Sequence, residues 1–170
     1  MLLPRLNFSQ QLRVLRVSRW ALAPVALLLA LEATRHTWAI LGLAAALALL
    51  LTLNHWISSL RRQFIREARL PPLLVGKIRA AHPRLNERDA DLVLRGLRQF
   101  FLAYQRSGHR FVAMPSKVVD TAWHEFILHT DAYQRWCRLA FGRMLHHTPA
   151  EVLGNDAKRN AGLRRAWVWA

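Results

Sequence analysis

Two apolar runs dominate the first third of the chain, Trp20 to Leu31 and Trp38 to Leu51, and neither contains a polar side chain. The second run, extended over 37–57, reaches the roughly 20 residues that a membrane-spanning helix needs. The first run approaches that length when it is extended over 18–34. The pattern predicts a transmembrane hairpin over 20–57. A single span and a buried, soluble helical hairpin are the alternatives.

Basic segments flank both runs. Residues 1–19 carry four arginines and no acid, and four arginines against one acid, Glu67, follow the second run. Positive flanks stay in the cytoplasm, and only a hairpin with its outer turn at 32–37 places both there. No small-residue cleavage site lies between the runs, so we expect the first run to be retained rather than removed with a signal peptide. We therefore expect a multi-pass membrane protein with two spans and both termini in the cytoplasm.

Beyond the second run, apolar positions recur at helical spacing between polar ones, which predicts a small helical domain over 58–170. The expected fold class is all-α: a transmembrane helical hairpin followed by a cytoplasmic helical bundle. Because Pro71 and Pro72 interrupt the first helix of this domain, we expect the core to lie beyond Pro72. A fragment that starts near Leu70 should then fold without the membrane segment.

Three helices are expected to form the core of the domain, over 87–106, 117–129 and 131–145. Asn86 and Ser116 are suitable N-caps for the first two helices. Two further start signals lie near the C-terminus of the chain. They are Thr148-Pro149 with Glu151, and Asn155.

The stretch 114–149 contains the candidate chemistry. It holds four of the eight histidines and the only cysteine. Asp120 and His124 are four residues apart on one helical face and can touch. A carboxylate beside an imidazole fixes the tautomer of the ring, as it does for many metal-binding histidines. With His146 and His147, which follow the next helix, this pair predicts a site for a divalent metal such as zinc.

The spacing of these residues limits the prediction. If the helix over 131–145 is intact, His146 lies roughly 9 Å along the helix axis from the position opposite Asp120. A shared site then needs a helix crossing or a frayed helix end. The alternative is a structural pair of Asp120 and His124 beneath Trp123. A zincin site is rejected, because His129 is five residues after His124 rather than four.

The run from Val118 to Pro149 resembles the core of the glycine-rich domain-containing protein-like family. The resemblance covers about 35 of the 170 residues, and it implies a domain of no settled enzymatic activity. Where plant members often carry a second histidine, this chain has Phe126. The matching positions are Val119, Asp120, Trp123, His124, Tyr133, Cys137, Gly142 and His146.

The amino-acid composition and the net charge of the chain mainly indicate which partners it binds. The formal net charge is +15 and 53% of the residues are hydrophobic, which fits a basic membrane protein. Twelve Lys or Arg against four acids over 61–110 favour contact with anionic lipid headgroups. No aromatic residues alternate with these charges for base stacking, so nucleic acid is the less favoured partner. A protein partner stays open.

Several functions remain open at this point. The favoured one is a membrane-anchored binding or scaffold module of unassigned activity. The alternatives are a metal-dependent, hydrolytic enzyme that uses Asp120, His124 and His146, and a nucleic-acid-binding protein that uses the basic region over 61–110. Cys137 lies on an apolar helical face, so it is expected in the core rather than as a nucleophile.

Overall fold

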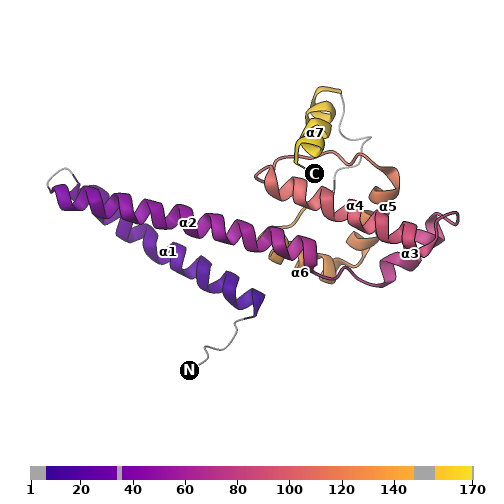
Figure 1. Ribbon diagram of the computed structural model, residues 1–170, viewed down its shortest axis with the longest axis horizontal. Helices are drawn as coiled ribbons and strands as arrows, with labels where there is room; N and C mark the ends of the chain where they lie inside the picture. Colours follow the sequence, from indigo (N-terminus) through magenta and orange to yellow (C-terminus); the bar gives the residue numbers. More distant parts are fainter. Residues whose placement is uncertain (1–6, 34–35, 148–155, 170) are drawn as a thin grey trace. The chain divides into compact units, whose positions relative to one another are not determined.

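The computed structural model describes residues 7–33, 36–147 and 156–169, and within these residues it contains seven α-helices and no strand (Figure 1). The predicted all-α fold class is confirmed at this level. The helices are α1 (Phe8–Glu32), α2 (Thr37–Glu67), α3 (Leu73–Ala81), α4 (Glu87–Arg106), α5 (Lys117–Leu128), α6 (Thr130–Ala140) and α7 (Asp156–Trp169).

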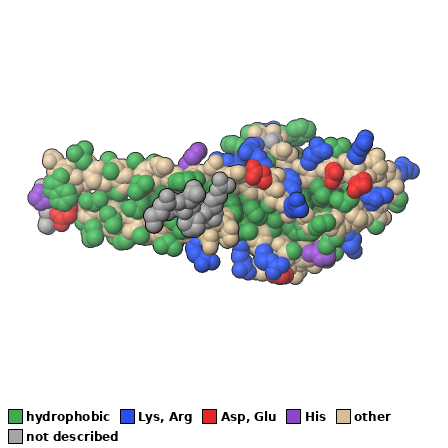
Figure 2. All heavy atoms as spheres, turned by 60° about the horizontal axis from the view of Figure 1, so that its bottom comes forward, with side chains coloured by type: hydrophobic (Ala, Val, Ile, Leu, Met, Phe, Trp, Pro, Cys, Tyr) green, Lys and Arg blue, Asp and Glu red, His purple; other side chains and the backbone are tan. Residues whose placement is uncertain are grey.

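The chain divides into two compact units, which we call unit 1 (Met1–Leu60) and unit 2 (Arg61–Ala170). In unit 1, α1 and α2 lie side by side (Figure 1). Gly42 allows their close approach, because a Cβ atom there would lie 3.1 Å from the Leu29 side chain. Both helices are long and apolar enough to cross a membrane, and only 6% and 17% of their most apolar windows are buried. Hydrophobic side chains cover much of their surface in Figure 2, whereas Lys and Arg side chains gather on unit 2.

In unit 2, α4 is the central helix: it packs against α3, α5 and α7, and α5 also packs against α3 and α6. The predicted bounds of α4 are confirmed. Its first turn is fixed by a reciprocal pair, in which the Asn86 side chain accepts from the Asp89 amide and the Asp89 carboxylate accepts from the Asn86 amide, each at 3.0 Å.

Aromatic side chains fill the space between α4, α5 and α6. Phe101 is fully buried, and its ring centroid lies 4.6 Å from that of Trp136 and 5.9 Å from that of Phe141. Phe126 meets Tyr133 edge-on at 5.1 Å. These tilted and edge-to-face pairs are the arrangements that the ring quadrupoles favour. They fix the angle between α5 and α6, on which the site depends.

The end of α2 also belongs to this core. Ile65 is fully buried, and the Phe64 ring lies 5.8 Å from Trp136. The guanidinium of Arg98 donates a 2.8 Å hydrogen bond to the Ile65 carbonyl, and burial lowers the pKa of Arg98. The expectation that the core lies beyond Pro72 is therefore wrong. The apolar residues at the end of α2 continue the pattern of the preceding apolar run, but they face unit 2.

The helix after α5 ends earlier than predicted. α5 spans Lys117–Leu128, close to the predicted 117–129, but α6 stops at Ala140 rather than at residue 145. Gly142 has φ +77° and its amide donates to the Arg138 carbonyl at 3.0 Å, which is the left-handed cap that ends many helices. The predicted extension from 141 to 145 is wrong for this reason.

At the C-terminus, α7 packs against α4 and against the segment that follows α4. A Cβ atom at Gly162 would lie 2.9 Å from the backbone nitrogen of Ala113, so only glycine fits at this contact. The Arg165 side chain donates to the Phe111 carbonyl. The start signals proposed at Thr148 to Glu151 and at Asn155 lie outside the described residues.

Candidate metal centre

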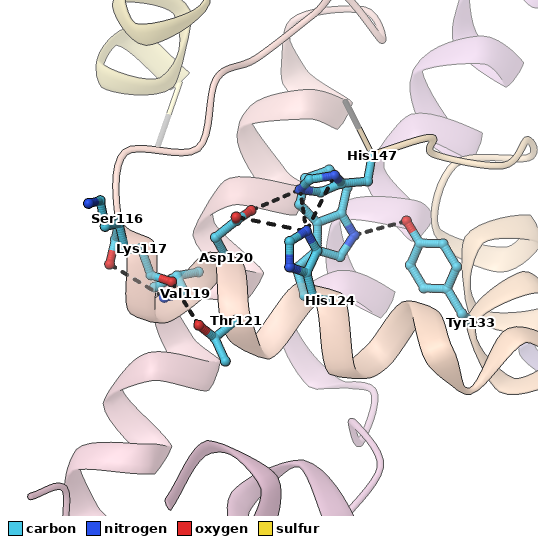
Figure 3. Close-up of polar contacts among 9 residues, drawn as sticks. Ser116, Lys117, Val119, Asp120, Thr121, His124, Tyr133 and His147 are labelled. Atoms are coloured by element: carbon cyan, nitrogen blue, oxygen red, sulfur yellow. Dashed lines mark hydrogen bonds and ion pairs between the residues drawn. The ribbon is translucent and has the colours of Figure 1, made fainter. Parts of the chain in front are cut away.

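Asp120 and His124 of α5 and His147 from the segment after α6 point toward one another (Figure 3). The Nε2 atom of His147 lies 3.0 Å from the Oδ1 atom of Asp120 and 3.0 Å from the Nε2 atom of His124. The Nε2 atom of His124 lies 3.9 Å from the Oδ2 atom of Asp120. One ligand atom from each residue therefore faces a common point.

These separations fit a metal ion. Two donors bound to a tetrahedral Zn²⁺ ion at about 2.0–2.1 Å are about 3.3 Å apart. The two contacts of the His147 Nε2 atom, at 3.0 Å each, are close to this value, and one ligand atom from each of the three residues lies within 4.8 Å of the other two. The His147 side chain is 13% exposed, that of Asp120 is 32% exposed and that of His124 is 52% exposed. The cluster is thus closed on the His147 side and open to solvent on the His124 side, which leaves room for a further ligand.

The early end of α6 brings His147 to the cluster. Because Gly142 turns the chain out of the helix, residues 143–147 return along α5 instead of continuing along the axis of α6. Side chains alternate along this return: Leu145 is buried, His146 is exposed and His147 faces Asp120. This frayed end closes the gap of roughly 9 Å that an intact helix would leave.

Two buried side chains hold the returning segment in place. The Tyr133 hydroxyl donates to the Leu145 carbonyl at 2.6 Å and accepts from the Trp123 indole nitrogen at 3.0 Å. The Trp123 ring in turn meets the His147 ring edge-on, with centroids 4.5 Å apart. Burial raises the pKa of Tyr133 above its usual range, so the phenol stays protonated and remains a donor.

A pocket of about 650 Å³ extends from this cluster along the surface of unit 2. Asp120 and His147 line one part of it, and Lys117 and Arg143 supply cationic side chains. Most of the remaining lining is apolar. These apolar lining residues include Phe100, Phe111, Val112, Met114, Met144 and Leu145.

His109 lines the pocket, and its backbone is in a strained conformation. Its φ of +64° is in the left-handed region, which a residue with a Cβ atom rarely adopts and which is often found at functional sites. Its Nε2 atom lies 2.7 Å from the Gln105 side-chain oxygen. Burial, followed by the charges of Arg143 and Arg61, lowers the pKa of His109, so the ring is neutral at pH 7.

The structure brings three of the four predicted ligand candidates together. His146 is exposed and lines the pocket, but it lies outside the cluster of Asp120, His124 and His147. The structure thus gathers His147 but not His146 with Asp120 and His124, and the side chain of His146 alternates away from that of His147. His129 is also outside the cluster, since it occupies the junction between α5 and α6.

Most of the remaining motif residues are structural supports. Cys137 is fully buried, and burial raises the pKa of its thiol, as expected for a core residue. Tyr133 and Gly142 position the segment that carries His147. Sequence reasoning missed Arg143, Lys117 and His109 as pocket residues. Two of these residues directly follow a glycine: Arg143 follows Gly142, and His109 follows Gly108. Such glycines indicate turns, and they could have drawn attention to both positions.

Residues 60–170 match the model of the UCP032817-like family, and the chain belongs to this family. The match begins at the boundary of unit 2, so the family is defined by the helical unit that carries the site. The resemblance to the glycine-rich domain-containing protein-like family is wrong. Several of its positions, such as Trp123, Tyr133 and Cys137, are buried residues of the core of unit 2. No curated protein and no solved structure matches the chain.

Proposed function

We propose that this protein is a divalent-metal-dependent hydrolase that its two N-terminal helices hold at a membrane. The observation that carries the proposal is the convergence of Asp120, His124 and His147 on one point beside a pocket. Two of these residues come from one helix and the third from a distant segment, which α6 and Tyr133 hold in place. Such support is typical of metal ligands, whose orientation depends on their neighbours.

The donor set determines which ion is expected. Two imidazoles and one carboxylate suit Zn²⁺, and they also suit Fe²⁺. Zinc is favoured for hydrolysis, because three protein ligands leave a position for water and the ion lowers the pKa of that water to about 7. An ion held by Asp120, His124 and His147 would supply an activated water, whose oxygen could attack the electrophilic centre of a substrate in the pocket. The bond to the leaving group would break, and the leaving group would take up the proton that the water gives up.

The membrane part of the proposal depends on unit 1. Its two helices expose apolar side chains along much of their length, and basic segments flank them on both sides. We infer two spans with both termini in the cytoplasm, and contact between the basic face of unit 2 and anionic lipid. Reporters fused at residue 5 and at residue 170 test this topology. Signals from opposite sides of the membrane would exclude the hairpin.

Metal content tests the site directly. The full chain is purified in non-ionic detergent, and bound zinc and iron are measured by elemental analysis. We expect about one ion per chain in the wild type. We expect less than about a tenth of that in Asp120→Asn, His124→Gln and His147→Gln, because each removes one of three ligands.

His146→Gln is the matched control, since it removes an adjacent imidazole that is outside the cluster. It should keep the wild-type metal content. Equal metal content in His146→Gln and His147→Gln would contradict the proposed ligand set. A thermal melt that is insensitive to chelator, combined with a large loss of stability in Asp120→Asn, would identify a structural pair instead.

A further inference from the structure

We propose that the pocket binds an organic phosphate: the phosphate group lies between the metal centre and the cations of the pocket, and an apolar substituent lies against the aromatic wall. The inference rests on the proposed function, because the metal ion supplies one contact to the phosphate. It adds the chemical class of the substrate.

The charges of the lining favour an anion. Asp120 is the only acid among the lining residues that the structure describes, and in the proposed site a divalent cation more than neutralises it. Lys117 and Arg143 are both exposed, so their charged ends are accessible to a ligand. The Arg143 guanidinium also lies beside the Tyr104 phenol, whose pKa is raised, chiefly by burial. Within the described part of the chain, the pocket of the proposed site therefore combines a metal ion with two side-chain cations and no further acid.

The apolar part of the lining favours a substituent rather than a free inorganic ion. Phe100 and Phe111 present aromatic rings, and Met114 and Met144 present flexible, polarisable side chains that adapt to different shapes. A volume of about 650 Å³ lies in the range of pockets that take small organic ligands. Inorganic phosphate alone would leave this surface in contact with water.

The number of charged groups in the lining favours phosphate over carboxylate. A phosphate monoester carries three terminal oxygens, so it can bind a metal ion and a planar guanidinium at the same time. A carboxylate has only two oxygens. In the hydrolytic step the water oxygen forms a bond to phosphorus, and the ester P–O bond breaks. The alcohol leaves with the proton that the water lost.

Calorimetric titration of the full chain in detergent, loaded with zinc, tests the inference. The probes are hexyl phosphate, inorganic phosphate and hexanol. We expect hexyl phosphate to bind at least ten-fold more tightly than inorganic phosphate, and hexanol to show no saturable binding. Arg143→Gln should weaken the binding of hexyl phosphate at least ten-fold.

Arg138→Gln is the matched control, because Arg138 is exposed on α6 and does not line the pocket. It should stay within two-fold of the wild type. Equal effects of Arg143→Gln and Arg138→Gln, or equal affinity for hexyl phosphate and inorganic phosphate, would overturn the inference. Dihexanoyl phosphatidic acid distinguishes the source: tighter binding than hexyl phosphate indicates a lipid headgroup, and weaker binding indicates a soluble ester.

The two proposals fail separately. Zinc bound through Asp120, His124 and His147 without a preference for hexyl phosphate would overturn the substrate class and leave the metal centre intact. A preference for hexyl phosphate that depends on Arg143, in a protein that binds no metal, would overturn the metal centre. It would leave an anion-binding pocket.

Discussion

The Tyr133 hydroxyl donates a 2.6 Å hydrogen bond to the backbone carbonyl of Leu145, two residues before His147. The same hydroxyl accepts from the Trp123 indole, against which the His147 ring packs. The buried Tyr133 phenol therefore sets the position of the backbone at Leu145 and of the Trp123 ring, which contacts His147. Tyr133 is a positioning residue, since it is not among the three residues that converge on the site.

Tyr133→Phe should separate this positioning role from simple packing. Loss of the hydroxyl leaves the Leu145 carbonyl and the Trp123 indole without this partner, which should lower the free energy of unfolding by about 1–3 kcal/mol. Zinc affinity should fall roughly ten- to a hundred-fold, as for other supports of metal ligands. Ile78→Val is the control, because it removes one methyl group from a fully buried side chain of α3, which is a different element from the segment around Leu145. It should lose stability but keep its zinc affinity.

Gly142→Ala should destabilise unit 2, because the left-handed conformation costs a residue with a Cβ atom roughly 1–2 kcal/mol. The new Cβ atom would also lie 2.9 Å from the guanidinium carbon of Arg61. Gly76→Ala in α3 should instead raise stability by about 0.5–1 kcal/mol, since open space surrounds that position. Thermal unfolding followed by circular dichroism measures both changes. The same sign for the two variants would contradict the assigned cap.

A fragment over 60–170 should fold cooperatively, whereas a fragment over 70–170 should be much less stable. The shorter fragment loses Ile65, which is fully buried, and the carbonyl that accepts from Arg98. Removal of a buried side chain of this size costs roughly 2–5 kcal/mol. Urea denaturation of the two fragments measures the difference. Equal midpoints would show that the end of α2 is dispensable for the core.

Acid should destabilise unit 2 partly through His109. Its pKa is lowered in the folded protein, so below about pH 6.5 the unfolded chain takes up a proton that the folded chain does not. The free energy of unfolding therefore falls as the pH decreases below this value. His109→Asn keeps a residue that tolerates the left-handed conformation and removes the titration. Its stability should depend less steeply on pH between 6.5 and 5 than that of the wild type, and parallel curves would contradict this role.

Local signals predicted most helix starts but not every helix end. Asn86 and Ser116 identified the starts of α4 and α5, because a capping side chain acts within one turn. The end of α6 was missed, since Met144 and Leu145 continue the apolar spacing of the helix beyond Gly142. Apolar spacing indicates which residues are buried, but not whether they belong to a helix. The segment after Gly142 turns back and buries Leu145, which a continued helix would also have buried.

The candidate site was therefore predicted only in part. Asp120 and His124 follow from spacing on one helix, which sequence alone can establish. The choice of His147 over His146 depends on alternation along a segment whose direction Gly142 and Tyr133 set. Arg143 and His109 reach the pocket through turns, so no periodicity marks them. Likewise, the hydrophobicity of Ile65 could not reveal whether it faces lipid or the core of unit 2.

The fit of Gly162 against the backbone of Ala113 has a consequence for the order in which the chain is made. A ribosome adds about 5–20 residues per second, so the 49 residues from 114 to 162 take roughly 2–10 s. During that interval the wall of the pocket around Phe111 has no covering helix, although α4 behind it is already synthesised. The surface around Phe111 is therefore covered only after α7 has been synthesised. Until then a chaperone could bind the aromatic side chains that are exposed there.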